Sequence, residues 1–279
     1  MELNNKTLFV SDLDGTLLNN NAQISEFTKQ TLNSLISSGL MFTVASARSI
    51  ISAGDILKGV NWNLNGIFMN GVLLCDIMTR KTADFCTINE SDVIKMISVF
   101  NKHNRPPSVF TFNGDYINGA YDTSISVRAG AIKHNADKDF FEARKNKYNE
   151  FLITDEYITQ NAIYVNGLDD YDTMKSICDE VKKLDSVACE LYEDIYSKKW
   201  LLECHSKNGT KATRAKQLKD RYNADKLVAF GDNFNDIELL KSADFAVVVD
   251  NAPDEVKKYA DIIIDSNIND GVAKYLNSL

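Results

Sequence analysis

The sequence predicts an α/β protein with a doubly wound, mostly parallel (Rossmann-like) core sheet and a second, α+β domain inserted into it. Three observations support this fold class. Apolar, β-branched runs alternate with amphipathic stretches in the first third of the chain and again in the last third. The apolar runs are continuous rather than alternating, which is typical of parallel strands covered by helices on both faces. Between the two regions, hairpin signals mixed with helices interrupt the alternation.

In the first region, Ser25 can cap a helix with its hydroxyl, and Gly39 suits the left-handed residue that ends many helices. Asn70-Gly71 is a strong hairpin signal. The expected elements, in order, are a strand at 7–12, a helix at 25–39, a strand at 40–47, a helix at 49–59, a strand at 66–69 and a strand at 72–76.

The last region repeats this rhythm, since each apolar run is followed by a helical one. The expected elements are helices at 209–222, 235–243, 253–260 and 270–279, with strands at 226–232, 245–249 and 261–265 between them.

The middle region has a different pattern. Its expected elements are a helix at 91–104, paired strands within 108–121, a charged helix-prone stretch, a strand at 162–167, a helix at 171–184, and strands at 187–196 and 199–205. The last of these strands is expected to return to the core. The predicted domains are therefore a core of residues 1–82 and 199–279 and an inserted domain of residues 83–198.

Composition narrows the function. The formal net charge of −8 argues against non-specific binding to nucleic acids or to anionic membranes. No apolar run approaches the roughly 18 residues of a membrane-spanning helix, and the first residues lack a signal-like apolar core. The five scattered cysteines are odd in number and include no C-x-x-C, which favours a reducing, cytoplasmic location. Nothing in the sequence indicates an oligomeric state.

Polar side chains follow several of the predicted core strands. In open parallel sheets, ligands bind at the carboxyl ends of the strands. We therefore expect one site to gather the residues that lie there, with a lysine that opens the helix after the insertion: Asp12, Asp14, Ser46, Lys211, Asp232 and Asp236.

A calcium loop of the EF-hand type does not fit these acids. That loop requires glycine at its sixth position and glutamate at its twelfth. Counted from Asp12, these positions hold Leu17 and Gln23, and counted from Asp232 the sixth position holds Ile237. The EF-hand interpretation is therefore excluded.

Four short motifs resemble those of a known family. DLDGT, the SAR of TVASARS, the lysine of NGTK, and GDNFND followed by DNAP are similar to the motifs of the haloacid dehalogenase superfamily. Their order, and the large insertion, resemble its Cof-type phosphatases with an α/β cap. The resemblance implies a hydrolase that removes phosphate from a small organophosphate, such as a sugar phosphate or a phosphorylated cofactor, with the inserted domain closing over the site as a cap.

The resemblance also implies roles for individual residues. Asp12 would be the nucleophile that forms an aspartyl-phosphate, and Asp14 would protonate the leaving alcohol and then activate water. A phosphate dianion beside a carboxylate meets a repulsion of about 8 kcal/mol at about 4 Å and an effective dielectric of about 20, so a cation is required.

That cation would be Mg²⁺, held by Asp12, the backbone carbonyl of Asp14 and Asp232. Lys211 would add a second positive charge, while Ser46 and Asn251 would bind the phosphate. The supporting residues would be Gly15, Thr16, Asn235 and Asp236.

The chain departs from the family pattern at two positions. Ala47 stands where the family usually has glycine, and Asp250 stands where glycine often precedes Asn251. Neither change touches the nucleophile, the acid or the metal ligands. Arg48 is equally compatible with a surface charge at a helix start.

Two other functions remain open at this level. A phosphomutase would return the phosphoryl group to a second hydroxyl of a bound sugar, and a non-catalytic sensor would only bind a phosphorylated metabolite. A receiver-type signalling domain fits less well, because its phospho-acceptor follows a later strand and it carries no insertion of this size.

Overall fold

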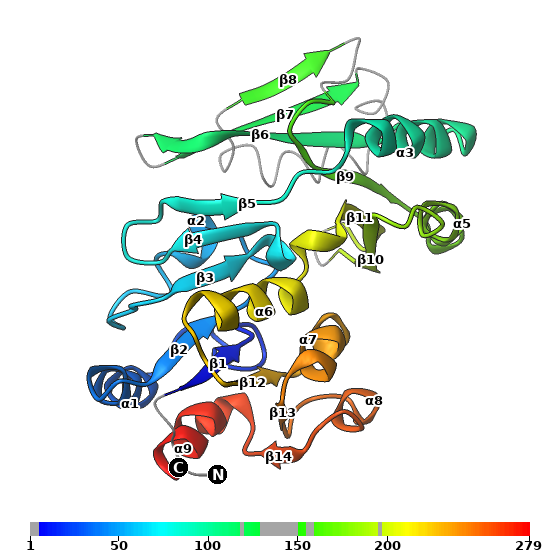
Figure 1. The fold of residues 1–279 in the computed structure, drawn as a ribbon. Helices are drawn as coiled ribbons and strands as arrows, with labels where there is room; N and C mark the ends of the chain where they lie inside the picture. Colours follow the sequence, from blue (N-terminus) through cyan, green and yellow to red (C-terminus); the bar gives the residue numbers. More distant parts are fainter. Residues whose placement is uncertain (1–5, 118–119, 129–149, 155–158, 195–196) are drawn as a thin grey trace. The chain divides into compact units, whose positions relative to one another are not determined.

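The computed structural model describes residues 6–117, 120–128, 150–154, 159–194 and 197–279. The chain forms two compact units (Figure 1). The first unit contains the chain up to Asp84 and from Thr210 to Leu279, and the second contains Phe85–Gly209. Along the described residues, no helix combines the length and the apolar character that crossing a bilayer requires.

A five-stranded sheet forms the centre of the first unit, and every pair of neighbouring strands in it is parallel. The parallel core that the sequence predicted is therefore confirmed. In sheet order the strands are β14 (Ile262–Ile264), β13 (Phe245–Val249), β12 (Lys226–Gly231), β1 (Thr7–Ser11) and β2 (Met41–Val44). All five residues of β1 are buried, as its unbroken apolar run requires.

The helices of the first unit are α1 (Glu26–Ser37), α2 (Ile50–Ala53), α6 (Lys211–Arg221), α7 (Ile237–Ser242), α8 (Asp254–Lys257) and α9 (Gly271–Asn277). Both predicted ends of the first helix are confirmed, since Ser25 accepts a hydrogen bond from the backbone of Thr28 and Gly39 has φ +99°. The second helix is much shorter than predicted, because Gly54 ends it and turns follow as far as Gly59.

A small three-stranded sheet completes the first unit, in the order β3 (Asn65–Phe68), β4 (Leu73–Asp76), β5 (Thr82–Phe85). The predicted hairpin is present, because β3 and β4 are antiparallel and the short 3₁₀ turn Met69–Gly71 joins them. A single parallel bridge between Ala45 and Ile67 links β3 to the end of β2.

The second unit is built on a six-stranded sheet in the order β10-β11-β9-β6-β7-β8, whose neighbours are antiparallel except for β7 and β8. Buried side chains of the helices α3 and α5, such as Met96 and Ile177, pack with sheet residues such as Val165 and Leu202 in one core. The elements are α3 (Glu90–Lys102), β6 (Ser108–Ile117), β7 (Ala120–Arg128), β8 (Glu150–Thr154), β9 (Ala162–Asp169), α5 (Tyr171–Val181), β10 (Val187–Glu193) and β11 (Trp200–Ser206).

One strand prediction is wrong. Residues 199–205 were expected to return to the core, but β11 pairs with both β10 and β9 and so belongs to the sheet of the second unit. The chain re-enters the first unit only at Thr210. The predicted charged, helix-prone stretch falls mainly on residues 129–149, outside the described residues.

Candidate active site

Three of the predicted acidic residues come together where β1 and β12 end. The two strands are parallel neighbours, with Ser11 opposite Phe230, so the residues that follow them emerge at one edge of the sheet. One carboxylate oxygen from each of Asp12, Asp232 and Asp236 lies within 4.8 Å of the others. Asp12 and Asp236 are buried and Asp232 is partly buried.

Lys211, the first residue of α6, places its ammonium group inside this cluster. Its Nζ donates to Oδ1 of Asp12 at 2.7 Å and to Oδ1 of Asp236 at 2.8 Å, and the side chain is only 3% exposed. Three carboxylates therefore face one buried ammonium, which leaves two negative charges without a partner when all the acids are ionised. Buried charges of one sign are costly, so the cluster favours a further cation.

The pKa shifts agree with this charge imbalance. Burial alone would lower the pKa of Lys211, but the carboxylates of Asp12 and Asp236 raise it well above its usual value, so the lysine stays charged. Burial, followed by repulsion from Asp236, raises the pKa of Asp12 against the opposing effect of Lys211. Burial also raises the pKa of Asp232 to about 6, although the hydrogen bond from Thr16 lowers it. The binding of a proton or of a second cation would therefore stabilise both Asp12 and Asp232.

Both carboxylate oxygens of Asp236 accept hydrogen bonds from other groups of the protein. Oδ1 accepts from Lys211, and Oδ2 accepts from the backbone N–H groups of Asp232 and Asn233, each at 3.1 Å. This carboxylate therefore orients the lysine and fixes the turn that carries Asp232. Asn235 lies on the exposed part of the same turn and makes no hydrogen bond through its side chain to the described residues.

The turn after β1 shapes the position of Asp232. Gly15 has φ +84°, and a Cβ at this position would lie 2.3 Å from Oδ2 of Asp232. The next residue, Thr16, donates its hydroxyl to Oδ1 of Asp232 at 2.7 Å. The glycine thus lets the turn approach the acid closely, and the threonine holds one of its oxygens.

Replacing Gly15 by alanine is therefore expected to lower the free energy of unfolding by more than backbone strain alone would. Gly39, at φ +99° with no atom within 4 Å of its Cβ position, provides a matched control. We expect Gly39→Ala to lower the free energy of unfolding by about 1 kcal/mol through strain alone. Gly15→Ala should lose roughly 2 kcal/mol more, because Asp232 must move. Urea denaturation in metal-free buffer measures both values, and equal losses would contradict the proposed close approach.

Asp14 has a partner that sequence reasoning did not identify. Nε and Nη2 of Arg48 donate to its two carboxylate oxygens, each at 2.6 Å, and the carboxyl group is about half exposed, at 48%. The backbone N–H of Arg48 also donates to the hydroxyl of Ser46, a buried residue just beyond the end of β2. The only sequence signal for this pairing is that Arg48 ends the SAR motif.

Asn251 braces the turn after β1 from behind. Its Nδ2 donates to the carbonyl oxygen of Gly15 at 2.8 Å, and its Oδ1 accepts from the backbone of Asn267. Asn267 in turn donates to the carbonyl oxygen of Leu18. A contact between Asn251 and phosphate, as the sequence suggested, would be left to its second amide hydrogen. The extra charge at Asp250 is paired with Lys257, at 3.2 Å.

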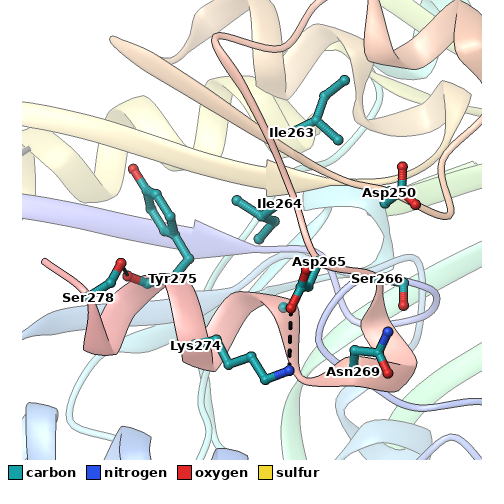
Figure 2. A pocket seen from close by; sticks show the side chains of 10 residues that line it. Asp250, Ile263, Ile264, Asp265, Ser266, Asn269, Lys274, Tyr275 and Ser278 are labelled. Carbon is teal, nitrogen blue, oxygen red and sulfur yellow. Dashed lines mark hydrogen bonds and ion pairs between the residues drawn. The ribbon is translucent and has the colours of Figure 1, made fainter.

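A cavity of about 510 Å³ lies elsewhere in the first unit, beside β14 and α9, and none of the predicted catalytic or metal-binding residues lines it. Figure 2 shows its lining, in which Lys274 is paired with Asp265 at 3.3 Å. The cavity lies next to the segment that contacts Asn251, because its lining residues Ser266 and Asn269 flank Asn267, whose backbone N–H donates to Asn251.

The comparisons with known proteins agree with the family resemblance of the sequence motifs. Residues 9–276 match the family model of the haloacid dehalogenase-like hydrolases. The chain is 26% identical to the 5-amino-6-(5-phospho-D-ribitylamino)uracil phosphatase YcsE of Bacillus subtilis, over 96% of this chain and 93% of that protein. It is 22% identical to the pyridoxal phosphate phosphatase YbhA of Escherichia coli, over 96% of both chains.

Among solved structures, the fold is similar to that of BT1666 from Bacteroides thetaiotaomicron, studied among phosphatases of the HAD superfamily. The TM-score is 0.76 at 17% identity, over 98% of this chain and 94% of the other. At this identity the likeness supports the fold.

Proposed function

Because the chain belongs to the haloacid dehalogenase-like hydrolase family, we propose that it is a phosphatase that hydrolyses monoesters of small phosphorylated metabolites. The observation that carries this proposal is the buried cluster of Asp12, Lys211, Asp232 and Asp236 at the carboxyl edge of the parallel sheet. A buried carboxylate fixed by a lysine, next to acids that favour a divalent cation, is suited to attack a phosphate dianion.

In the first step, Asp12 attacks phosphorus and forms an aspartyl-phosphate. The hydrogen bond from Lys211 to its Oδ1 fixes the orientation of the attacking carboxylate. Lys211 keeps its charge through the reaction, and it offsets the negative charge that builds up on the phosphoryl oxygens. Ser46 would donate its hydroxyl to the same group.

Asp14 protonates the leaving alkoxide and then takes a proton from the water that opens the aspartyl-phosphate. Both of its oxygens accept from Arg48 in this structure. Transfer of a proton to the leaving oxygen therefore requires one of these two hydrogen bonds to open. Arg48 acts as a positioning residue, since it sets the direction of the carboxyl group and reaches it from the turn that also carries Ser46.

The residues fit Mg²⁺. Asp12 and Asp232 each have a carboxylate oxygen that makes no hydrogen bond to the described residues, and together with the backbone carbonyl of Asp14 they would hold the ion. Asp236 would stay outside the ligand set, because its oxygens are already used. When bound, the ion supplies the positive charge that lets a phosphate dianion approach Asp12.

Magnesium should stabilise the protein more at pH 7.5 than at pH 5. With its pKa raised to about 6, Asp232 contributes stability that is fully present below the unfolded pKa and is lost as pH rises through about 6. Mg²⁺ offsets that loss once the proton has gone. Melting curves with Mg²⁺ and with EDTA at the two pH values measure the difference. Asp232→Asn should reduce the magnesium shift and its pH dependence, and an equal shift in wild type at both pH values would contradict the proposed ligand.

The substrate class is supported by the two named relatives, because each carries the name of a phosphatase for a small phosphorylated metabolite. A panel of sugar phosphates, nucleotides and phosphorylated cofactors, assayed for free phosphate with Mg²⁺ and with EDTA, tests it. Magnesium-dependent release of phosphate from one class is expected. An isomerised sugar phosphate would indicate a mutase instead, and binding without turnover would indicate a sensor.

A further inference from the structure

The second unit contains a cluster of three free thiols that the proposed phosphatase mechanism does not use. Cys178 lies on α5, Cys189 on β10 and Cys204 on β11, and all three join the core between the helices and the sheet. The Sγ atoms of Cys189 and Cys204 are 3.7 Å apart. Contact alone does not make two cysteines a disulfide pair, so the backbone geometry between β10 and β11 decides the question.

Opposite residues on antiparallel strands form hydrogen-bonded and non-hydrogen-bonded pairs in alternation, and the hydrogen bonds at the two ends of β10 and β11 show which pairs are which. The backbone N–H of Lys207 donates to the carbonyl of Ser186, and that of Asp194 donates to the carbonyl of Lys199. The register of β10 and β11 puts the members of each pair directly opposite one another. Both pairs are therefore hydrogen-bonded pairs, and between them hydrogen-bonded and non-hydrogen-bonded pairs alternate along the strands.

Cys189 lies directly opposite Cys204 in this register. Cys189 is three residues from Ser186 and five from Asp194, both of which belong to hydrogen-bonded pairs. Because these separations are odd, Cys189 and Cys204 form a non-hydrogen-bonded pair. In such pairs the Cα atoms are about 4.5 Å apart and the side chains approach closely. A disulfide needs Cα atoms about 4.4–6.8 Å apart. The backbone thus admits a cross-strand disulfide with little movement.

Solvent reaches the pair from one side. Cys189 is partly exposed, whereas Cys204 and Cys178 are buried. A small reagent should therefore meet Cys189 first, and Cys204 is the thiol placed to react next. A hydrogen bond with Cys178 lowers the pKa of Cys189, but the hydrogen bond with Cys204 and burial together raise it above its usual value. The first reaction is accordingly slow at neutral pH.

We propose that Cys189 and Cys204 are a modification site that a small disulfide, such as oxidised glutathione, converts into a cross-strand disulfide. The Cys189 thiolate attacks one sulfur of the reagent, forms a mixed disulfide and releases one glutathione. The Cys204 thiolate then attacks the Cys189 sulfur and releases the second glutathione. Two protein thiols are oxidised, one glutathione disulfide is reduced, and the two thiol protons end on the released glutathiones.

The bond would tie β10, which is at one end of the sheet order among the described strands, to its neighbour β11. It would restrict the unfolded chain, and a rise in Tm of roughly 5–10 °C is expected from the length of the loop it closes. Dithiothreitol should reverse the rise. The inference is independent of the phosphatase proposal, because it involves neither the acidic cluster nor a metal.

The test uses the full chain, incubated with oxidised glutathione or with dithiothreitol and then digested without reduction for peptide mapping by mass spectrometry. A crosslinked peptide that joins Cys189 to Cys204 is expected, together with the rise in Tm. Cys178→Ser, a matched control from the same cluster, should retain the crosslink, and Cys204→Ser should stop at the mixed disulfide on Cys189. A wild-type crosslink between Cys178 and Cys189, or a mixed disulfide that goes no further, would overturn the proposal.

Discussion

Replacing Asp12 by asparagine is expected to abolish phosphate release, with a loss of turnover on the order of 10⁴-fold or more. The amide keeps the size of the carboxyl group but is too weak a nucleophile to form the phosphoryl bond. The substitution also removes one of three crowded acids from around Lys211. The folded protein should therefore survive it, and Tm in EDTA should stay level or rise, because the charge imbalance is smaller.

The measurement is steady-state phosphate release on the best substrate of the panel, alongside melting curves. Asn21→Asp, in the exposed loop that follows, is a control for a single Asp/Asn change near this turn and should behave as wild type. Turnover by Asp12→Asn within tenfold of wild type would show that another group makes the bond to phosphorus.

Replacing Lys211 by methionine should damage both turnover and stability. Methionine retains most of the length but leaves Asp12 and Asp236 buried without their shared cation. Breaking a buried ion pair from one side typically costs about 3–5 kcal/mol, and turnover should fall at least about 10²-fold with the loss of a charge beside the phosphoryl group. Mg²⁺ should recover part of the lost stability, since it supplies charge to the same cluster.

Lys216, an exposed residue on the same helix, gives the matched control Lys216→Met. It carries the same chemical change outside the cluster, so turnover and Tm should stay close to wild type. Urea denaturation with Mg²⁺ and with EDTA, together with phosphate release, measures both variants. If the two variants lost similar amounts of stability, Lys211 would not be the buried counter-ion of the acids.

The sequence predicted the parallel core and the meeting of Asp12 with Asp232, because the residues after neighbouring parallel strands share an edge. This rule needs only strand order and strand ends. The two ends of the first helix could also be predicted, because Ser25 caps its start and Gly39 adopts the left-handed conformation after its end. These features depend on residues close together in the chain.

Features that depend on long side chains or on strand register were not readable. Arg48 reaches Asp14 through a flexible side chain, and Asn251 meets Gly15 across 236 positions in the chain. The run at 199–205 is apolar enough for either sheet, so only its pairing with β9 and β10 shows which one it joins. The opposition of Cys189 and Cys204 likewise follows from register alone.

The most direct test of the central claim is to trap the phosphoryl group on Asp12. Asp14→Asn should still react with 4-nitrophenyl phosphate, whose leaving group needs no proton, but it should open the aspartyl-phosphate slowly. After an acid quench, peptide mapping should find the phosphoryl mass on the peptide that contains Asp12, and hydroxylamine should remove it. A phosphorylated peptide elsewhere, or full release of 4-nitrophenol with no phosphorylated peptide at any time, would contradict the account.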